Sequence, residues 1–158
     1  MRPIFTRLIP CFWWLLAGTA SAADTAAVPK PDPALSPAAV VQLQLAALAK
    51  VDQPERDAGF VTVFGFASPG NRSQTGPLKR FAGLIREGYP AMLNHRSTTL
   101  LPLVMQGDVA IQGVELIDRI GVLHRYIFEL SKQPEGEYKD CWMTDSVYQA
   151  PEAPEIAT

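Results

Sequence analysis

The chain has 158 residues, of which 47% are hydrophobic and 19% charged, and its formal net charge is −2 at pH 7. This length can hold one domain with a core of its own. The weak negative charge argues against a nucleic acid or an anionic membrane as partner, because both bind basic surfaces.

The N-terminal segment has the pattern of a cleavable secretory signal peptide. Two arginines accompany an almost wholly apolar run over residues 8–17, and Ala20-Ser21-Ala22 offers small residues for cleavage. The apolar run is about half of the ~20 residues that a membrane-spanning helix needs. We therefore expect cleavage after residue 22, no membrane span in the mature chain, and a periplasmic or secreted protein. The mature net charge becomes about −4, and the remaining thiol, Cys141, cannot form an internal disulfide.

Both ends of the mature chain have the composition of unfolded segments. Residues 23–35 are rich in alanine and proline, which predicts an extended linker. Residues 149–158 carry prolines between acidic residues, which predicts a disordered acidic tail. A single domain is thus expected over residues 36–148.

Helices are predicted in the first half of this domain. Ser36 is a favoured N-cap, Pro37 suits the first helical position, and an apolar stripe continues to about Lys50. Residues 60–67 fit a strand by composition and a helix by spacing. The capping-box spacing of Asp52 and Glu55 favours the helix, with Pro54 just inside its start.

Turn-forming residues separate this helix from the next one. Ser68-Pro69-Gly70-Asn71 is expected to end the second helix. A third helix is expected to begin near Gly76-Pro77 and to end with Gly88 as its C-cap. Its predicted buried face consists of Leu78, Phe81, Ala82 and Ile85.

The second half of the domain changes to the period of two that is typical of strands. Strands are predicted over residues 98–105, 109–117, 122–132 and 138–147, with Pro102 at an edge or bulge. The predicted faces are Val109, Ile111, Glu115 and Ile117; His124, Tyr126, Phe128 and Leu130; and Tyr138, Asp140 and Trp142. Short links between these segments favour an antiparallel meander. The expected fold class is α+β, with N-terminal helices packed on a curved antiparallel four-stranded sheet, cone-like, whose open mouth would hold a small ligand.

Motifs for metal, nucleotide and hydrolase chemistry are missing from the sequence. It has no H-x-x-x-H or C-x-x-C pair, no G-x-S-x-G, no Walker loop and no G-x-G-x-x-G after a strand. We therefore expect neither a metal nor a cofactor.

His124 is the best candidate for a catalytic acid or base. It shares a predicted strand face with Tyr126, and Asp140 or Glu115 is expected to face it across the sheet. A carboxylate beside an imidazole would hold its tautomer and tune its pKa for proton transfer. Glu115 among apolar neighbours could itself be a buried base with a raised pKa. The alternatives are a satisfied histidine at the rim of the core and a solvated glutamate.

Two further groups of residues are candidates for ligand binding. Residues 71–76 precede a helix N-terminus, where backbone N–H groups together with Arg72 and Lys79 could bind a carboxylate or phosphate. The alternative is a capping loop without a ligand. Aromatic residues are expected to line a pocket or, alternatively, to fill the core, namely Tyr126, Trp142, Tyr89 and Phe81.

Several short runs together resemble a known family. They are FASP at 66–69, TGPL at 75–78, Phe81, Tyr89-Pro90 and CWMTD at 141–145. The chain resembles, over about residues 40–148, an uncharacterised domain family of exported bacterial proteins and some plant proteins. That family resembles the nuclear-transport-factor-2-like cone, whose members include ketosteroid isomerases, small dehydratases and many non-catalytic binding domains. The resemblance implies a helix at residues 60–67 and carries over no catalytic residue.

Three hypotheses for function follow. The leading one is a non-catalytic binding or accessory module of the cell envelope, with a small-molecule ligand or an envelope protein as partner, and with a homodimer as one form. The second is a cofactor-independent isomerase, dehydratase or hydrolase in which His124, Asp140 or Glu115 moves the proton. The third is a structural protein–protein interaction domain that uses the sheet face and exposes an apolar patch.

Overall fold

The computed structural model describes residues 28–151, so the predicted leader over residues 1–22 lies outside the described residues. The helices are α1 (Pro37–Ala49), α2 (Ala58–Phe66), α3 (Pro69–Thr75), α4 (Leu78–Gly88) and the 3₁₀ helix η1 (Pro90–Met92). The strands are β1 (Ser97–Gln106), β2 (Val109–Ile117), β3 (Leu123–Lys132) and β4 (Trp142–Gln149).

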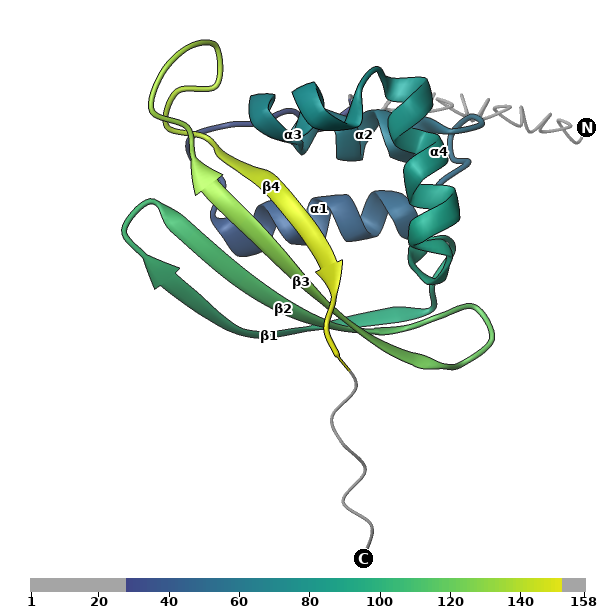
Figure 1. Cartoon of the computed structure of the whole chain (residues 1–158). Helices are drawn as coiled ribbons and strands as arrows, with labels where there is room; N and C mark the ends of the chain where they lie inside the picture. Colours follow the sequence, from purple (N-terminus) through teal and green to yellow (C-terminus); the bar gives the residue numbers. More distant parts are fainter. Residues whose placement is uncertain (1–27, 152–158) are drawn as a thin grey trace, which may run out of the picture.

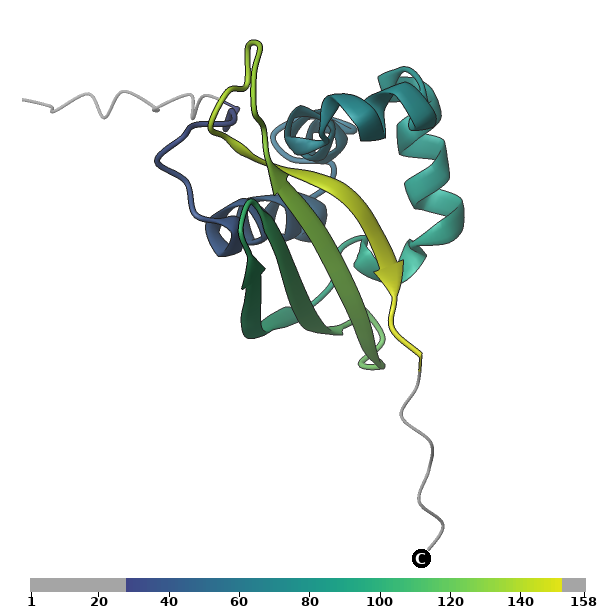
Figure 2. The same cartoon turned by 60° about the vertical axis from the view of Figure 1, so that its left-hand side comes forward.

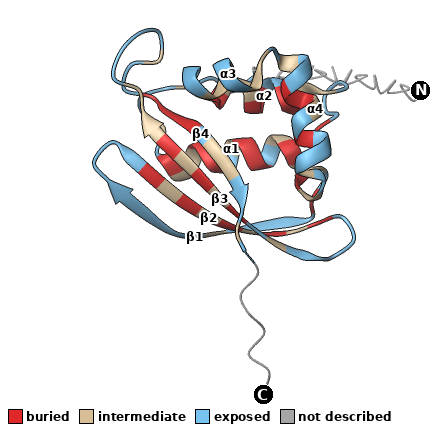
Figure 3. Ribbon diagram, in the orientation of Figure 1, coloured by how far each residue is buried: buried red, intermediate tan, exposed pale blue. Residues whose placement is uncertain are grey.

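The strands form one antiparallel sheet in the order β1-β2-β3-β4, with the helices gathered on one side (Figure 1). Figure 2 shows the sheet bent, with α1 lying against its inner face. This arrangement confirms the α+β class, with N-terminal helices packed on a curved, open sheet. Buried residues concentrate in α1 and in the central strands, whereas β1 is exposed along nearly its whole length (Figure 3).

Helix α1 forms for the reasons that its sequence indicates. The Oγ of Ser36 accepts a hydrogen bond from the N–H of Ala39 at 3.2 Å, and Pro37 occupies the first turn. The predicted apolar stripe, Val41, Leu45 and Leu48, is almost completely buried. One polar residue, Gln44, lies on the same buried side of the helix.

The start of α2 corrects the capping-box prediction. The helix begins at Ala58, four residues after Pro54, because residues 51–57 form turns. Asp52 accepts a hydrogen bond from the N–H of Asp57 at 3.0 Å and so stabilises the turn instead of the helix start. Asp57, the N-cap, adopts a left-handed backbone with φ of 67° and makes no side-chain capping bond.

Residues 69–75 form the helix α3, where a loop was predicted. Ser68-Pro69 ends α2, but Ser68 also caps α3, because its Oγ accepts a hydrogen bond from the N–H of Asn71 at 3.2 Å. The same two residue types that end one helix are favoured at the start of another. The prediction for α4 is confirmed at its buried residues Phe81, Ala82 and Ile85, although Gly88 is its last helical residue and Tyr89 is the C-cap.

The predicted alternation is confirmed in β2 and in β3, but the set named for β2 lies on the face that the helices do not cover. In β2 the buried residues are Ala110, Gln112, Val114 and Leu116, so Val109, Ile111, Glu115 and Ile117 lie on the outer face. Both sets are largely apolar, and only the position of the helices decides which set is covered. On β3, Tyr126, Phe128 and Leu130 are buried on the inner face, where His124 also lies.

The edge strand β1 has the predicted irregularity, whereas the edge strand β4 begins later than predicted. The register of β1 against β2 shifts between Leu100 and Leu103, at the predicted Pro102 irregularity, and Gln112 donates to the carbonyl of Leu101 there. In contrast, β4 begins at Trp142, so Tyr138 and Asp140 belong to the preceding loop and not to the strand. The loop is closed by backbone hydrogen bonds between Gln133 and residues 140–141.

The close approach of α1 and α2 requires a glycine at position 59. A Cβ on Gly59 would collide with the carbonyl oxygen of Ala47 and would lie 2.8 Å from the Cα of Val51. Both neighbouring atoms are backbone atoms, so no side-chain rotation can relieve the clash.

We expect Gly59→Ala to lower the free energy of unfolding by about 2 kcal/mol or more, because overpacking forces the two helices apart. Gly83→Ala is the matched control within α4, because a Cβ there meets no atom within 4 Å. It should raise stability by about 0.5–1 kcal/mol through helix propensity. Urea denaturation of both variants measures these changes, and equal effects would contradict the close-approach argument.

Candidate functional site

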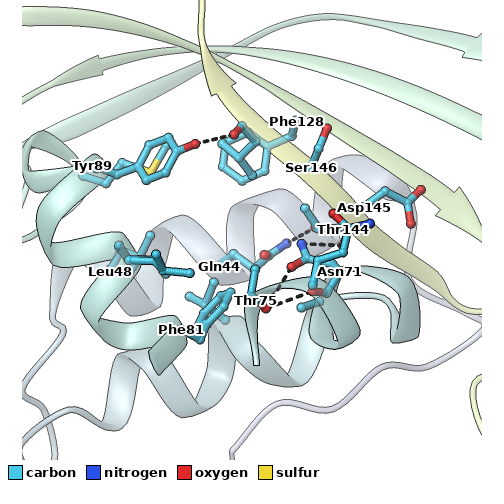
Figure 4. A pocket seen from close by; sticks show the side chains of 18 residues that line it. Gln44, Leu48, Asn71, Thr75, Phe81, Tyr89, Phe128, Thr144, Asp145 and Ser146 are labelled. Carbon is cyan, nitrogen blue, oxygen red and sulfur yellow. Dashed lines mark hydrogen bonds between the residues drawn. The ribbon is translucent and has the colours of Figure 1, made fainter. Parts of the chain in front are cut away.

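A cavity of about 450 Å³ lies between the helical layer and the β4 side of the sheet (Figure 4). All four α-helices, together with η1, β3 and β4, contribute residues to its wall. The wall is predominantly apolar, with Leu48, Val63, Phe81, Ile85, Met92 and Phe128 among the lining residues. A cavity of this size and character is typical of small-molecule sites.

Polar side chains gather at one end of the cavity. The Nε2 of Gln44 on α1 donates to the Oγ1 of Thr144 on β4 at 2.8 Å and to the carbonyl of Val40 at 3.3 Å. The Nδ2 of Asn71 on α3 donates to the backbone carbonyl of Thr144 at 3.2 Å. Thr75 donates its hydroxyl proton to the backbone carbonyl of Asn71 at 2.9 Å. Figure 4 shows these four residues converging on the same part of the wall.

A bulge in β4 places Thr144 in the cavity wall. The pairing with β3 shifts there, so that Leu130 faces Thr144 and Glu129 faces Ser146. Asp145 is the extra residue and is exposed. The hydroxyl of Ser146 points to the outer face, where it donates to Glu129 at 2.7 Å. Bulges commonly redirect side chains next to functional sites.

Tyr89 closes the other end of the cavity. Its hydroxyl donates to the carbonyl of Val147 at 2.6 Å and so ties the end of α4 to β4. The ring of Tyr126 lies next to it, with centroids 6.1 Å apart, but Tyr126 is not among the lining residues. Burial, followed by the negative charges that Tyr89 and Asp118 can carry, raises the pKa of Tyr126.

Charge is nearly absent from the cavity wall. In the part of the chain that the structure describes, Asp145 is the one charged residue that lines it, and this residue is exposed to solvent. Within residues 28–151, no group of three or more His, Cys, Asp or Glu residues has the geometry to hold a metal ion. The described helices include none that is long and apolar enough to cross a bilayer. Burial, followed by the charges of Asp32 and Asp140, raises the pKa of the Cys141 thiol.

The three predicted acid/base residues are not brought together. Nε2 of His124 lies 3.0 Å from Oδ2 of Asp118, a residue at the end of β2, and His124 does not line the cavity. Glu115 lies on the outer face, where it forms an ion pair with Arg125 at 2.9 Å. Asp140 is in the β3–β4 loop with a φ of 64°. Because alternate strand residues face opposite sides, Glu115 cannot share a face with His124 in this register.

Asp118 contacts His124 and also forms hydrogen bonds to the backbone of the β2–β3 turn. Its Oδ1 accepts hydrogen bonds from the N–H groups of Ile120 and Val122, both at 2.9 Å. Burial alone would raise the pKa of Asp118, but hydrogen bonds from Val122, His124 and Ile120 outweigh it and lower the pKa from 3.8 to about 2. His124 in turn stacks on Tyr126, with centroids 6.4 Å apart.

Two of the predicted ligand-binding residues, Trp142 and Arg72, have structural roles. Trp142 is nine-tenths buried in the core. Arg72 donates from Nε to the carbonyl of Phe64 at 3.1 Å and from a terminal nitrogen to that of Gly65 at 2.6 Å, so it caps the C-terminus of α2. Its guanidinium also lies over the ring of Tyr138, 5.0 Å from the centroid. Lys79, the second predicted cation, is exposed.

Sequence reasoning missed the polar end of the cavity. Gln44 has a signal that could have revealed it, because it stands between Val41 and Leu48 on the buried stripe of α1, where a polar residue needs a partner. Thr144 and Asp145 lie in the CWMTD run, whose only signal in the sequence is the resemblance to the family. The bulge that turns Thr144 inward has no signal in the sequence.

The sequence matches the family described as domain of unknown function DUF4864 over residues 34–155. This chain belongs to that family. No curated protein and no solved structure matches it. The family match spans every residue of the cavity wall, from Gln44 on α1 to Val147 on β4.

Below neutral pH we expect the Asp118 contacts to contribute a pH-dependent part of the stability. The carboxyl group has a lower pKa in the folded chain than its ordinary 3.8, so its contribution is present above pH 4 and is lost as the pH falls toward 2. Asp118→Asn should therefore flatten the fall in unfolding free energy between about pH 4 and pH 2. Urea denaturation across this range measures the effect. Asp108→Asn, at the exposed β1–β2 turn, is the control that should keep the wild-type profile.

Proposed function

We propose that this domain is a non-catalytic module that binds a small, mainly apolar molecule. The observation that carries the proposal is the cavity of about 450 Å³, which lies in the usual size range of ~300–1,000 Å³ for small-molecule sites. Its wall is apolar over most of its extent, and the side chains of Gln44, Asn71, Thr75 and Thr144 gather at one end. An apolar wall supplies affinity, and a few fixed polar groups supply orientation.

The chemistry of the wall supports binding without turnover. The polar side chains that gather at one end, those of Gln44, Asn71, Thr75 and Thr144, are amides and hydroxyls, which neither gain nor lose a proton near neutral pH. The histidine and carboxylate that form a close pair, His124 and Asp118, stand outside the lining residues. General acid–base catalysis requires the group to be within hydrogen-bond reach of the substrate.

Export is part of the same proposal. The pattern of residues 1–22 supports removal of a leader and a place in the periplasm or outside the cell. The helices-then-sheet order supports a cone of the nuclear-transport-factor-2-like type, in which the ligand would lie between the sheet and the helices.

Filling the cavity should abolish binding. We expect the neutral fluorophore N-phenyl-1-naphthylamine to bind the purified protein saturably, and Val147→Phe to weaken its affinity at least tenfold. Val147 lines the cavity from β4, where an aromatic side chain is compatible with the strand. Val122→Phe, at an exposed residue outside the cavity, should leave the affinity unchanged. Equal affinities of the two variants for the fluorophore, or the absence of saturable binding to the wild-type protein, would refute the proposal.

A second candidate function is association with a second copy of the chain. The β1–β2 hairpin exposes several large apolar side chains, namely Leu101, Leu103, Val104, Met105 and Val109. Residues 97–107 carry no charge, and β1 is an edge strand. A symmetric contact brings identical surfaces together, so a neutral strand can pair with its copy without like-charge repulsion.

We expect the wild-type protein to be a dimer by multi-angle light scattering, and Val104→Lys to be monomeric, because it places a charge on the neutral strand. Val122→Lys is the control, since Val122 is similarly exposed but lies outside the hairpin. A wild-type protein that stays monomeric at micromolar concentration would overturn this second candidate and leave the cavity proposal intact.

A further inference from the structure

We infer that the ligand of the cavity is an uncharged molecule whose apolar body ends in one group that both donates and accepts a hydrogen bond, such as an alcohol or a primary amide. This inference rests on the proposed function and specifies its ligand. Gln44 and Thr144 carry it, because the two side chains are hydrogen-bonded to each other in the cavity wall and each keeps an unused hydrogen-bonding group.

The amide of Gln44 offers an acceptor to the cavity. Its nitrogen is identified by the bond to the carbonyl of Val40, because a carbonyl can only accept. Both protons of that nitrogen are used, one to Val40 and one to Thr144. The oxygen accepts no hydrogen bond from the described residues, although Gln44 is only 1% exposed. Every fully enclosed side-chain nitrogen and oxygen in residues 28–151 has a partner, so this oxygen must face open space, and the cavity is the space that Gln44 lines.

The hydroxyl of Thr144 offers the complementary donor. Its oxygen accepts from Gln44, and its own proton is given to no group among residues 28–151. The residue is held rigidly, because its backbone carbonyl accepts from the N–H of Ser68 at 2.9 Å and from Asn71 at 3.2 Å. A fixed donor beside a fixed acceptor binds a matching group with little loss of conformational entropy.

The wall offers no counter-charge to an anionic ligand. Its one carboxylate among residues 28–151, Asp145, is exposed to solvent, which screens its attraction for a cation. Among residues 28–151, no lysine, arginine or histidine lines the cavity, so a carboxylate or phosphate would lose its hydration without a counter-charge. The exposed Asp145 at the rim repels an anion further. A neutral hydrogen-bond donor, in contrast, satisfies the amide oxygen of Gln44, which accepts no hydrogen bond from residues 28–151.

A rigid probe series that varies only the end group tests the inference on the wild-type protein. The probes are 2-naphthalenemethanol, 2-naphthamide, 2-methylnaphthalene, 2-naphthoate and 2-naphthylmethylammonium, titrated by isothermal calorimetry at pH 7. We expect the alcohol and the amide to bind about tenfold more tightly than 2-methylnaphthalene, which corresponds to one net hydrogen bond. The two ions should bind at least tenfold more weakly than the alcohol.

Substitutions at Gln44 and Thr144 test whether these two residues cause the tighter binding of the alcohol. Thr144→Val and Gln44→Leu should each remove the advantage of the alcohol over 2-methylnaphthalene, whereas Thr144→Ser, which keeps the hydroxyl, should retain it. Thr98→Val, the same change at an exposed residue of β1, should have no effect. Affinity for 2-methylnaphthalene shows in each variant that the cavity is intact.

The possible outcomes separate this inference from the proposed function. Equal affinity for all five probes, or an advantage of the alcohol that survives Thr144→Val, would overturn the inference and leave the cavity proposal standing. Tightest binding of the ammonium probe, lost in Asp145→Asn, would overturn it as well. If none of the probes binds, both proposals fall.

Discussion

Thr144 links the sheet to two parts of the helical layer, and the cavity depends on these contacts. Its hydroxyl accepts a hydrogen bond from Gln44 on α1, while its carbonyl accepts from Ser68 and Asn71 at the α2–α3 junction. The bulge at Asp145 makes this possible, because it changes which side chains of β4 point inward. Residues from distant parts of the chain therefore form the cavity wall. The hydrogen bonds at its polar end hold α1 and α3 against β4.

The distribution of polar groups divides the domain into two chemically different regions. Close contacts between ionisable side chains lie outside the cavity, with Asp118 and His124 at the β2–β3 turn and Glu115 and Arg125 on the outer face. The polar side chains of the cavity wall, in contrast, are mostly amides and hydroxyls, and the charged residue Asp145 is exposed to solvent. Burying a charge without a partner costs far more than burying a hydrogen-bonded neutral group, so this separation is physically favourable. It also gives the cavity a chemistry suited to binding a neutral molecule.

Local signals in the sequence were sufficient for the fold class and for most elements. The cap at Ser36 and the stripe on α1 could be predicted because a helix start and a buried helix face depend on residues close in sequence. The same holds for the irregularity of β1 at Pro102, since proline lacks the N–H that a sheet needs. The errors fall where a local signal has two outcomes. Asp52 caps a turn instead of a helix, and Ser68 both ends α2 and begins α3.

The candidate site was predictable only in outline. Local patterns predict amphipathic helices that cover a meander with a hollow between them, and Tyr89, a predicted pocket residue, lines the cavity. Tertiary structure alone decided that the even-numbered face of β2 is covered, that Asp118 is the partner of His124, and that Gln44 meets Thr144. Each of these outcomes depends on strand register or on contacts between residues far apart in the chain. Alternation and spacing define which residues share a face. They carry no information about which face the helices bury or which distant residue becomes the contact partner of a given side chain.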